Sequence, residues 1–361
     1  MSCSFKKIVV KVGTQVLANP DGSLDLQAME AIVRQLANLK QQGIQVVLVS
    51  SGAVGAGRSL VQLPANINRV VRRQVLASVG QVKLMNLYAE QFGVSGLHCA
   101  QVLATKEDFR DRQHYINMKN CLLALQRNNL IPIVNENDVV AISELMFTDN
   151  DELAALVAAM VNAEALIILS SVDGVLDGPP TDPNSRVIPV IDASTGDYSP
   201  VITAERSSFG RGGMQTKFRM AQRAAQVGIT TFIANGKRSD ILLDILSGNG
   251  LCTRFEPSAQ GLSNLKKWIA YSDAEHKGSV QINAGAKEAL QHKERISSLL
   301  PVGVTGIEGD FERGDMIQVL DENGVIIALG LAQYGAEKAR QWMGQKGKKP
   351  LIHYDYMVLT G

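Results

Sequence analysis

A glycine-rich stretch followed by a lysine, FGRGGMQTK (209–217), is the first feature of the sequence that could do chemistry. Small residues let backbone N–H groups approach an anion, and a helical pattern begins at Met214. Arg211 and Lys217 add positive charge beside that helix start. The stretch differs from the common phosphate loop, whose lysine follows a glycine, because Thr216 precedes Lys217. It therefore predicts either an anion site or a flexible basic turn ahead of a helix.

Two clusters of Asn and Asp could supply the polar partners of such a site. Asn135 and Asp138 come just past an apolar run, and Asp149, Asn150 and Asp151 stand where a helical pattern begins. Asp and Asn cap helices routinely, so capping alone explains the second cluster. Taken together, the clusters could bind an ammonium group, bind Mg²⁺ through its waters, or orient nearby lysines.

Two further segments carry polar groups at the ends of apolar runs. Lys11 lies near the end of the first run, and Ser51 and Gly52 follow the second. A lysine within an apolar strand is costly unless its amine reaches an anion or extends to solvent at the strand end. Lysines, backbone amides and Mg²⁺ are the groups that phosphoryl transfer uses, so the four segments together favour that reaction.

The elements that must position these residues alternate between strands and helices. Apolar runs predict strands at 6–13, 44–50, 97–104, 130–138, 165–171 and 230–236, and helical spacing predicts helices around 29–39, 151–162 and 214–227. Apolar strands linked by helices indicate a parallel sheet covered on both faces, with ligands beyond the carboxyl ends of its strands. The polar clusters fall at those ends. Residues 172–191 are rich in turn signals and predict a hairpin.

The pattern of predicted strands and helices changes near residue 260. Residues 1–259 contain the alternating pattern, 260–277 read as a connection, and 278–361 are short strand-like pieces punctuated by glycine. We therefore expect an α/β domain, a linker and a small β-rich domain.

Composition narrows the class of protein. The formal net charge of +1 over 361 residues gives no global reason to expect nucleic acid or an anionic membrane as a partner. The four cysteines and five histidines are scattered without metal-ligand spacing, so no metal bound by those residues is expected. The most apolar segment is interrupted by Asn162 and Glu164, and the first apolar run is too short for a signal peptide. A cytoplasmic protein is the expectation.

The motifs also resemble a known family. VVKVGTQVL, VLVSSGAVGAG, IPIVNENDVVA, DNDELAALVA and GRGGMQTK occur in the order and approximate spacing of bacterial glutamate 5-kinases, and SSLLPVGVTGIEGDFERGD resembles their appended PUA domain. The resemblance implies the amino acid kinase fold, a three-layer α/β/α sandwich with a mainly parallel central sheet, followed by a PUA-like domain.

What the family does becomes an expectation for this chain. Its members use MgATP to phosphorylate the γ-carboxylate of L-glutamate, the first step of proline biosynthesis, and pass a labile acyl phosphate to glutamyl phosphate reductase. Proline commonly inhibits them, and they are commonly dimers or tetramers. The resemblance therefore implies ATP with Mg²⁺, a homo-oligomer, and no membrane partner.

Roles for individual residues are implied by matching the motifs. Lys11 and Lys217 would hold the ATP phosphates, and Asp151 would organise the two lysines. Glutamate would be bound by residues from three motifs: Ser51, Gly52, Asn135, Asp138 and Asn150. ATP would be contacted after the fifth strand and by the glycine-rich loop, through Ser170, Ser171, Gly210, Arg211, Gly212, Gly213 and Met214.

Three parts of the sequence depart from the family's pattern. Arg211 replaces a threonine of the loop, Ser170 and Ser171 replace Thr-Asp with Leu176 in place of a nearby tyrosine, and residues 146–148 replace Lys-x-Gly. These departures concern the nucleotide contacts more than the glutamate site.

Two alternatives remain open. A kinase of N-acetylglutamate, aspartate or a similar acid would share the fold, although KVGT and the PUA-like tail favour the glutamate enzymes. An RNA-binding or regulatory protein is the other, because PUA domains bind RNA elsewhere. Residues 261–361 contain 12 Lys and Arg and 12 Asp and Glu, with one small cluster at Lys346, Lys348 and Lys349, so RNA binding is not expected.

Overall fold

The computed structural model describes residues 5–140, 147, 149–179, 181–192, 213–258, 276–292 and 297–360. The chain forms two compact units, Met1–Asp108 with Arg112–Gly261 and Phe109–Asp111 with Leu262–Gly361. Most of the predicted linker, 260–277, lies outside the described residues, so the predicted domain limits stay predictions.

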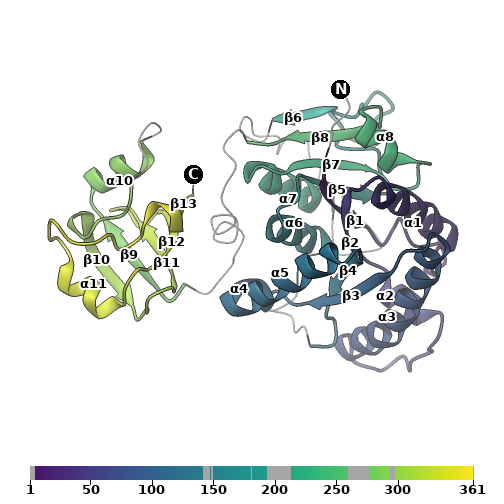
Figure 1. Ribbon diagram of the computed structural model, residues 1–361, viewed down its shortest axis with the longest axis horizontal. Helices are drawn as coiled ribbons and strands as arrows, with labels where there is room; N and C mark the ends of the chain where they lie inside the picture. The colour runs from purple at the N-terminus through teal and green to yellow at the C-terminus, as the bar shows by residue number, and fades with distance from the viewer. Residues whose placement is uncertain are drawn as a thin grey trace. The chain divides into compact units, whose positions relative to one another are not determined.

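An eight-stranded sheet forms the centre of the first unit, in the order β3-β4-β2-β1-β5-β7-β8-β6 (Figure 1). The strands are β1 (Lys7–Val12), β2 (Gln45–Ser50), β3 (Cys99–Ala104), β4 (Ile131–Glu136), β5 (Ala165–Ser170), β6 (Val190–Asp192), β7 (Thr230–Asn235) and β8 (Cys252–Glu256). Every pairing is parallel except the antiparallel one between β7 and β8. The six apolar runs of the sequence are therefore strands, as predicted.

Helices cover both faces of this sheet. The helices of this part of the chain are α1 (Leu26–Gln41), α2 (Ala53–Arg58), α3 (Arg69–Val94), α4 (Glu107–Arg110), α5 (Arg112–Arg127), α6 (Asn150–Val161), α7 (Met214–Gln226) and α8 (Ile241–Ser247). Helices α1, α3 and α8 lie on one face and α5, α6 and α7 on the other, which gives the predicted three-layer sandwich (Figure 1).

The central helix α6 is buried on every side. All its residues from Asp151 to Val161 are buried, because an alanine- and valine-rich sequence leaves no polar face for solvent. The helix contacts β1, β2, β4 and β5 and lies between α5 and α7. Its first turn is thereby fixed at the carboxyl ends of the strands.

The described residues of the segment 172–191 form the predicted hairpin-like excursion. Leu176 pairs with Val187 in an isolated antiparallel bridge, and the backbone N–H of Asp177 donates to the carbonyl of Arg186. The chain then enters β6 at the edge of the sheet.

The second unit is built on a five-stranded mixed sheet in the order β10-β9-β11-β12-β13. Its strands and helices are β9 (Gly278–Ile282), α10 (Ala284–Gln291), β10 (Val304–Gly309), β11 (Met316–Leu320), β12 (Ile326–Leu331), α11 (Ala336–Trp342) and β13 (Met357–Leu359). This is the small β-rich domain that the sequence predicted. Nowhere in the described chain is there a helix with the length and apolarity needed to span a membrane.

Two glycines let α2 and α3 cross with their backbones in contact. A Cβ atom on Gly80 would lie 1.8 Å from the carbonyl oxygen of Ala53, and one on Gly57 would lie 2.0 Å from that of Leu76. No side chain fits at either position, so the crossing fixes α3 against the turn that follows β2.

Replacing Gly80 with alanine should therefore destabilise the first unit. Overpacking against rigid backbone should outweigh the gain in helix propensity and cost about 2–3 kcal/mol of unfolding free energy. Gly93, in the same helix, has no atom within 4 Å of a built Cβ, so Gly93→Ala is the matched control. The measurement is urea unfolding followed by circular dichroism. Equal effects of the two substitutions would contradict the packing argument.

Candidate active site

One cavity of about 1190 Å³ lies at the carboxyl ends of the central strands. Predicted site residues from six separate segments line it: Lys11, Ser51, Gly52, Asn135, Asp138, Asn150, Ser170, Ser171 and Lys217. Gly213 is the N-cap of α7 and Met214 is its first residue. Gly210, Arg211 and Gly212 lie outside the described residues, as do Met146 and Thr148.

A buried carboxylate joins the two predicted catalytic lysines. The Nζ atom of Lys11 lies 2.5 Å from Oδ1 of Asp151, and Nζ of Lys217 lies 3.0 Å from Oδ2. Asp151 is wholly buried and Lys11 is 4% exposed, so the amine of Lys11 reaches an anion rather than solvent. Two ammonium groups share one carboxylate, so Lys11, Lys217 and Asp151 together carry a net charge of +1.

The charge state of Asp151 follows from competing effects. Burial alone would favour the neutral carboxyl group, but the charges of Lys11 and Lys217 and their hydrogen bonds outweigh it and lower the pKa of Asp151 to about 2. The carboxylate is therefore ionised at neutral pH.

Asp149 has the opposite environment. Its Oδ1 accepts hydrogen bonds from the backbone N–H groups of Asp151 and Glu152 and so caps α6. Its Oδ2 is buried and has no hydrogen-bond partner within the described part of the chain. Burial, together with the nearby charge of Asp151, raises the pKa of Asp149 to about 6.

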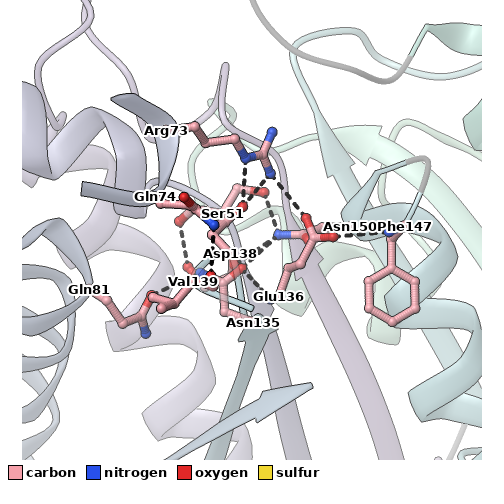
Figure 2. Close-up of polar contacts among 11 residues, drawn as sticks. Ser51, Arg73, Gln74, Gln81, Asn135, Glu136, Asp138, Val139, Phe147 and Asn150 are labelled. Atoms are coloured by element: carbon pink, nitrogen blue, oxygen red, sulfur yellow. Dashed lines mark hydrogen bonds and ion pairs between the residues drawn. The ribbon is translucent and has the colours of Figure 1, made fainter. Parts of the chain in front are cut away.

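The amide of Asn150 ties three segments together (Figure 2). Its Nδ2 lies 3.0 Å from the carbonyl oxygen of Ser50, 3.0 Å from Oγ of Ser51 and 3.1 Å from Oδ1 of Asn135. Nδ2 of Asn135 in turn donates to Oε1 of Gln81 on α3. Asn135 is a residue of β4 itself, not one just past the strand as the sequence suggested.

The turn after β2 completes this side of the cavity. Gly52 adopts a φ of 109°, which residues with a side chain rarely adopt, and it is the N-cap of α2. Oγ of Ser50 forms a buried 2.7 Å hydrogen bond with the hydroxyl of Tyr88, which anchors the strand end to α3. Sequence reasoning missed Tyr88, since an aromatic residue in a helical pattern is ordinarily core.

Sequence reasoning also missed Arg73, which forms ion pairs with two carboxylates at the end of β4. Nε of Arg73 donates to Oδ1 of Asp138 at 2.6 Å, and its Nη2 donates to Oε2 of Glu136 at 3.0 Å (Figure 2). Oε1 of Glu136 accepts a hydrogen bond from the backbone N–H of Phe147 at 2.9 Å. Glu136 could have been suspected from its place within NEND, whereas Arg73 has no distinguishing signal in the pattern RVVRRQ.

Beyond β5, the predicted nucleotide residues face the same cavity. Ser170 is the last residue of β5, and Oγ of Ser171 donates to Oε1 of Gln15 at 2.7 Å. Across the described ranges, no three His, Cys, Asp or Glu side chains are arranged to hold a metal ion.

Comparison with known proteins identifies the class. Residues 6–235 match the amino acid kinase family, and residues 278–354 match the PUA domain. The carbamate kinase from Giardia lamblia bound to AMP-PNP has a similar fold, with a TM-score of 0.52 and 19% identity over 72% of this chain and 100% of that one. The chain therefore belongs to the amino acid kinase family.

Its place within that family follows from full-length relatives. The glutamate 5-kinase of Bacteroides thetaiotaomicron is 48% identical over 361 residues, covering 99% of this chain and 100% of the relative. That of Chlorobaculum tepidum is 49% identical over 356 residues, covering 99% and 98%. Within the amino acid kinases, the chain belongs with the glutamate 5-kinases.

The raised pKa of Asp149 predicts a specific pH dependence of stability. A carboxyl group whose pKa is about 6 when folded and 3.8 as a model value binds its proton more tightly in the folded state. Its contribution to stability therefore falls as the pH rises from about 4 to 6. Asp149→Asn keeps a capping oxygen and removes this loss. We expect the stability of the variant relative to wild type to rise by about 1–3 kcal/mol across that range.

Urea unfolding at pH 4.5, 5.5, 6.5 and 7.5 measures this difference. Asp25→Asn is the matched control, because Asp25 is the N-cap of α1 and is only half-buried. A pH-independent difference between wild type and Asp149→Asn would show that Asp149 does not titrate in this range.

Proposed function

We propose that this chain transfers the γ-phosphoryl group of MgATP to the γ-carboxylate of L-glutamate. The main support for the proposal is that buried Asp151 holds both Lys11 and Lys217 beside the cavity. Asn150, with its hydrogen bonds to the ends of β2 and β4, lines the same cavity. Glutamate 5-kinase is also the name of the full-length relatives, and the reaction begins proline biosynthesis.

The lysine side of the cavity suits the phosphoryl group. Phosphoryl transfer depends on positioning and on neutralising charge spread over the transferring group. Lys11 and Lys217 supply two positive charges that Asp151 fixes in place before any substrate binds. Such preorganised charge lowers the barrier without reorganisation during the reaction. The start of α7 at Met214 adds backbone N–H groups, and we include the preceding loop, 210–212, in the ATP site.

The opposite side suits a zwitterionic amino acid. Asp138 would bind the ammonium group, and Ser51, Gly52, Asn135 and Asn150 would bind and orient the carboxylates. The attacking carboxylate is already ionised at neutral pH, since its reference pKa is about 4.3. The reaction therefore needs no strong general base.

Mg²⁺ fits this site as a partner of the nucleotide. Mg²⁺ keeps several waters and binds through one or two carboxylates together with substrate phosphates. Among the described cavity residues, Asp149 offers a buried carboxylate oxygen that lacks a hydrogen-bond partner. When bound, the ion would neutralise charge on the phosphate oxygens.

The finer expectations belong to the same proposal. Proline has the α-ammonium and α-carboxylate groups of glutamate, so it can compete for the amino-acid side of the cavity as a feedback inhibitor. We also propose a cytoplasmic dimer or tetramer that supplies its acyl phosphate to glutamyl phosphate reductase.

Hydroxylamine trapping tests the activity directly. The assay contains MgATP, hydroxylamine and one acid at a time: L-glutamate, N-acetylglutamate or L-aspartate. Hydroxamate formation with L-glutamate, reduced by added proline, is the expected result. Turnover of another acid without turnover of L-glutamate would overturn the proposal.

Lys217→Ala should lower turnover far more than it weakens glutamate binding. Loss of a charge that acts on the transferring phosphoryl group should reduce kcat by about 100-fold or more, with the KM for glutamate little changed. Arg219→Ala removes an exposed positive charge from the same helix and serves as the control. Steady-state kinetics measure kcat and the KM for glutamate of each variant. An unchanged kcat in Lys217→Ala would show that Lys217 does not act on the phosphoryl group.

Asp138→Ala should mainly raise the KM for glutamate. Removal of the carboxylate that binds the substrate's ammonium group should cost about 10-fold or more in KM, while kcat changes little. Asp182→Ala, in the exposed hairpin, is the control. An unchanged KM would remove Asp138 from the glutamate site.

A further inference from the structure

We propose that Arg73 recognises the α-carboxylate of the amino-acid substrate while it holds Asp138 in position. The inference rests on the proposed function and deepens it, because it assigns a specificity-determining residue to the amino-acid side of the cavity.

The guanidinium group of Arg73 is partly engaged and partly available. Its Nε and Nη2 contact the carboxylates of Asp138 and Glu136, which are 7% and 5% exposed. Arg73 is 27% exposed and lines the cavity. Its Nη1 makes no hydrogen bond or ion pair with any described residue, and Figure 2 shows one terminal nitrogen directed away from both carboxylates. Nη1 still has two N–H donors to offer.

The structure of the substrate places its α-carboxylate near that group. The ammonium and α-carboxylate groups of an amino acid are attached to the same carbon atom. An ammonium group bound by Asp138 therefore brings the α-carboxylate close to the cation that already contacts Asp138. Arginine is well suited to this partner, because its planar fork of N–H donors matches the geometry of a carboxylate.

The direction of the substrate leads to the same residue. The reacting γ-carboxylate must face Lys11, Lys217 and the nucleotide, so the α end must point away from them. Both lysines are held on Asp151. Four of the described arginines line the cavity: Arg58, Arg69, Arg72 and Arg73. Of these four, Arg73 is the one bonded to Asp138 in the described structure.

A purely structural role is the rival explanation. Glu136 bonds both Arg73 and the backbone N–H of Phe147, so Arg73 also connects α3 to the segment that precedes α6. Loss of Arg73 could therefore disturb the site without any lost contact to substrate. The test must separate these two roles.

A substrate analogue without the α-carboxylate charge makes the separation. L-Isoglutamine keeps the ammonium group and the γ-carboxylate, and replaces the α-carboxylate with a neutral carboxamide of the same shape. The readout is the ratio of kcat/KM for L-glutamate to kcat/KM for L-isoglutamine. Arg73→Gln should lower this ratio by about 10- to 100-fold, chiefly through a higher KM for glutamate.

Two further variants complete the experiment. Arg73→Lys keeps the charge but not the fork, so the ratio should fall less; it also replaces Arg73→Gln if that variant does not fold. Lys83→Gln removes a positive charge from the same helix, where Lys83 Nζ donates to Ser59 Oγ, and should leave the ratio unchanged.

The outcomes distinguish the two proposals. A lower ratio in Arg73→Gln supports recognition of the α-carboxylate. Equal losses on both substrates, or no loss on either, leave the ratio unchanged and overturn this inference alone. A wild-type chain that does not phosphorylate L-glutamate overturns the proposed function, and this inference with it.

Discussion

The ion pairs of Asp151 are the interaction on which the site depends. A carboxylate with no solvent exposure is tolerable only when opposite charges surround it. Lys11 comes from β1 and Lys217 from α7, so one carboxylate fixes the relation between a central strand and a helix 206 positions further along the chain. Loss of either lysine leaves buried charge poorly compensated. The same contacts that stabilise the fold thereby keep two cations ready beside the cavity.

The apolar body of α6 places that carboxylate. Because the helix is buried from Asp151 to Val161, it can sit only against the sheet and between its neighbours. Asp149 caps its first turn. Asn150 and Asp151 of that turn contact residues near the ends of β2, β4 and β1, so the helix begins at the carboxyl ends of these strands. Packing and capping together leave little freedom to the polar residues at its start.

Much of this arrangement could be predicted from the sequence, and the reason is local. Fully apolar runs predicted the strands, polar residues near the strand ends predicted Lys11 and Asn135, and the polar helix start predicted Asn150. These residues meet because parallel strands collect their carboxyl ends at one edge of the sheet. Arg73 could not be found in this way. Its contacts with Glu136 and Asp138 span 63 and 65 positions, and they depend on the crossing of α2 and α3 at Gly57 and Gly80. The spacing of apolar residues within a helix does not predict contacts between residues so far apart in the sequence.

Two adjacent residues divide the cavity into its two sides. Successive residues of an α-helix point about 100° apart around its axis. Asn150 therefore reaches the ends of β2 and β4, while Asp151 reaches Lys11 and Lys217. One helix start thus sets the distance between the groups that we propose bind the amino acid and the groups that we propose bind the phosphates. Phosphoryl transfer demands that distance be fixed, because the attacking and leaving oxygens must lie in line. The buried helix, rather than any flexible loop, is the part of the described structure that fixes it.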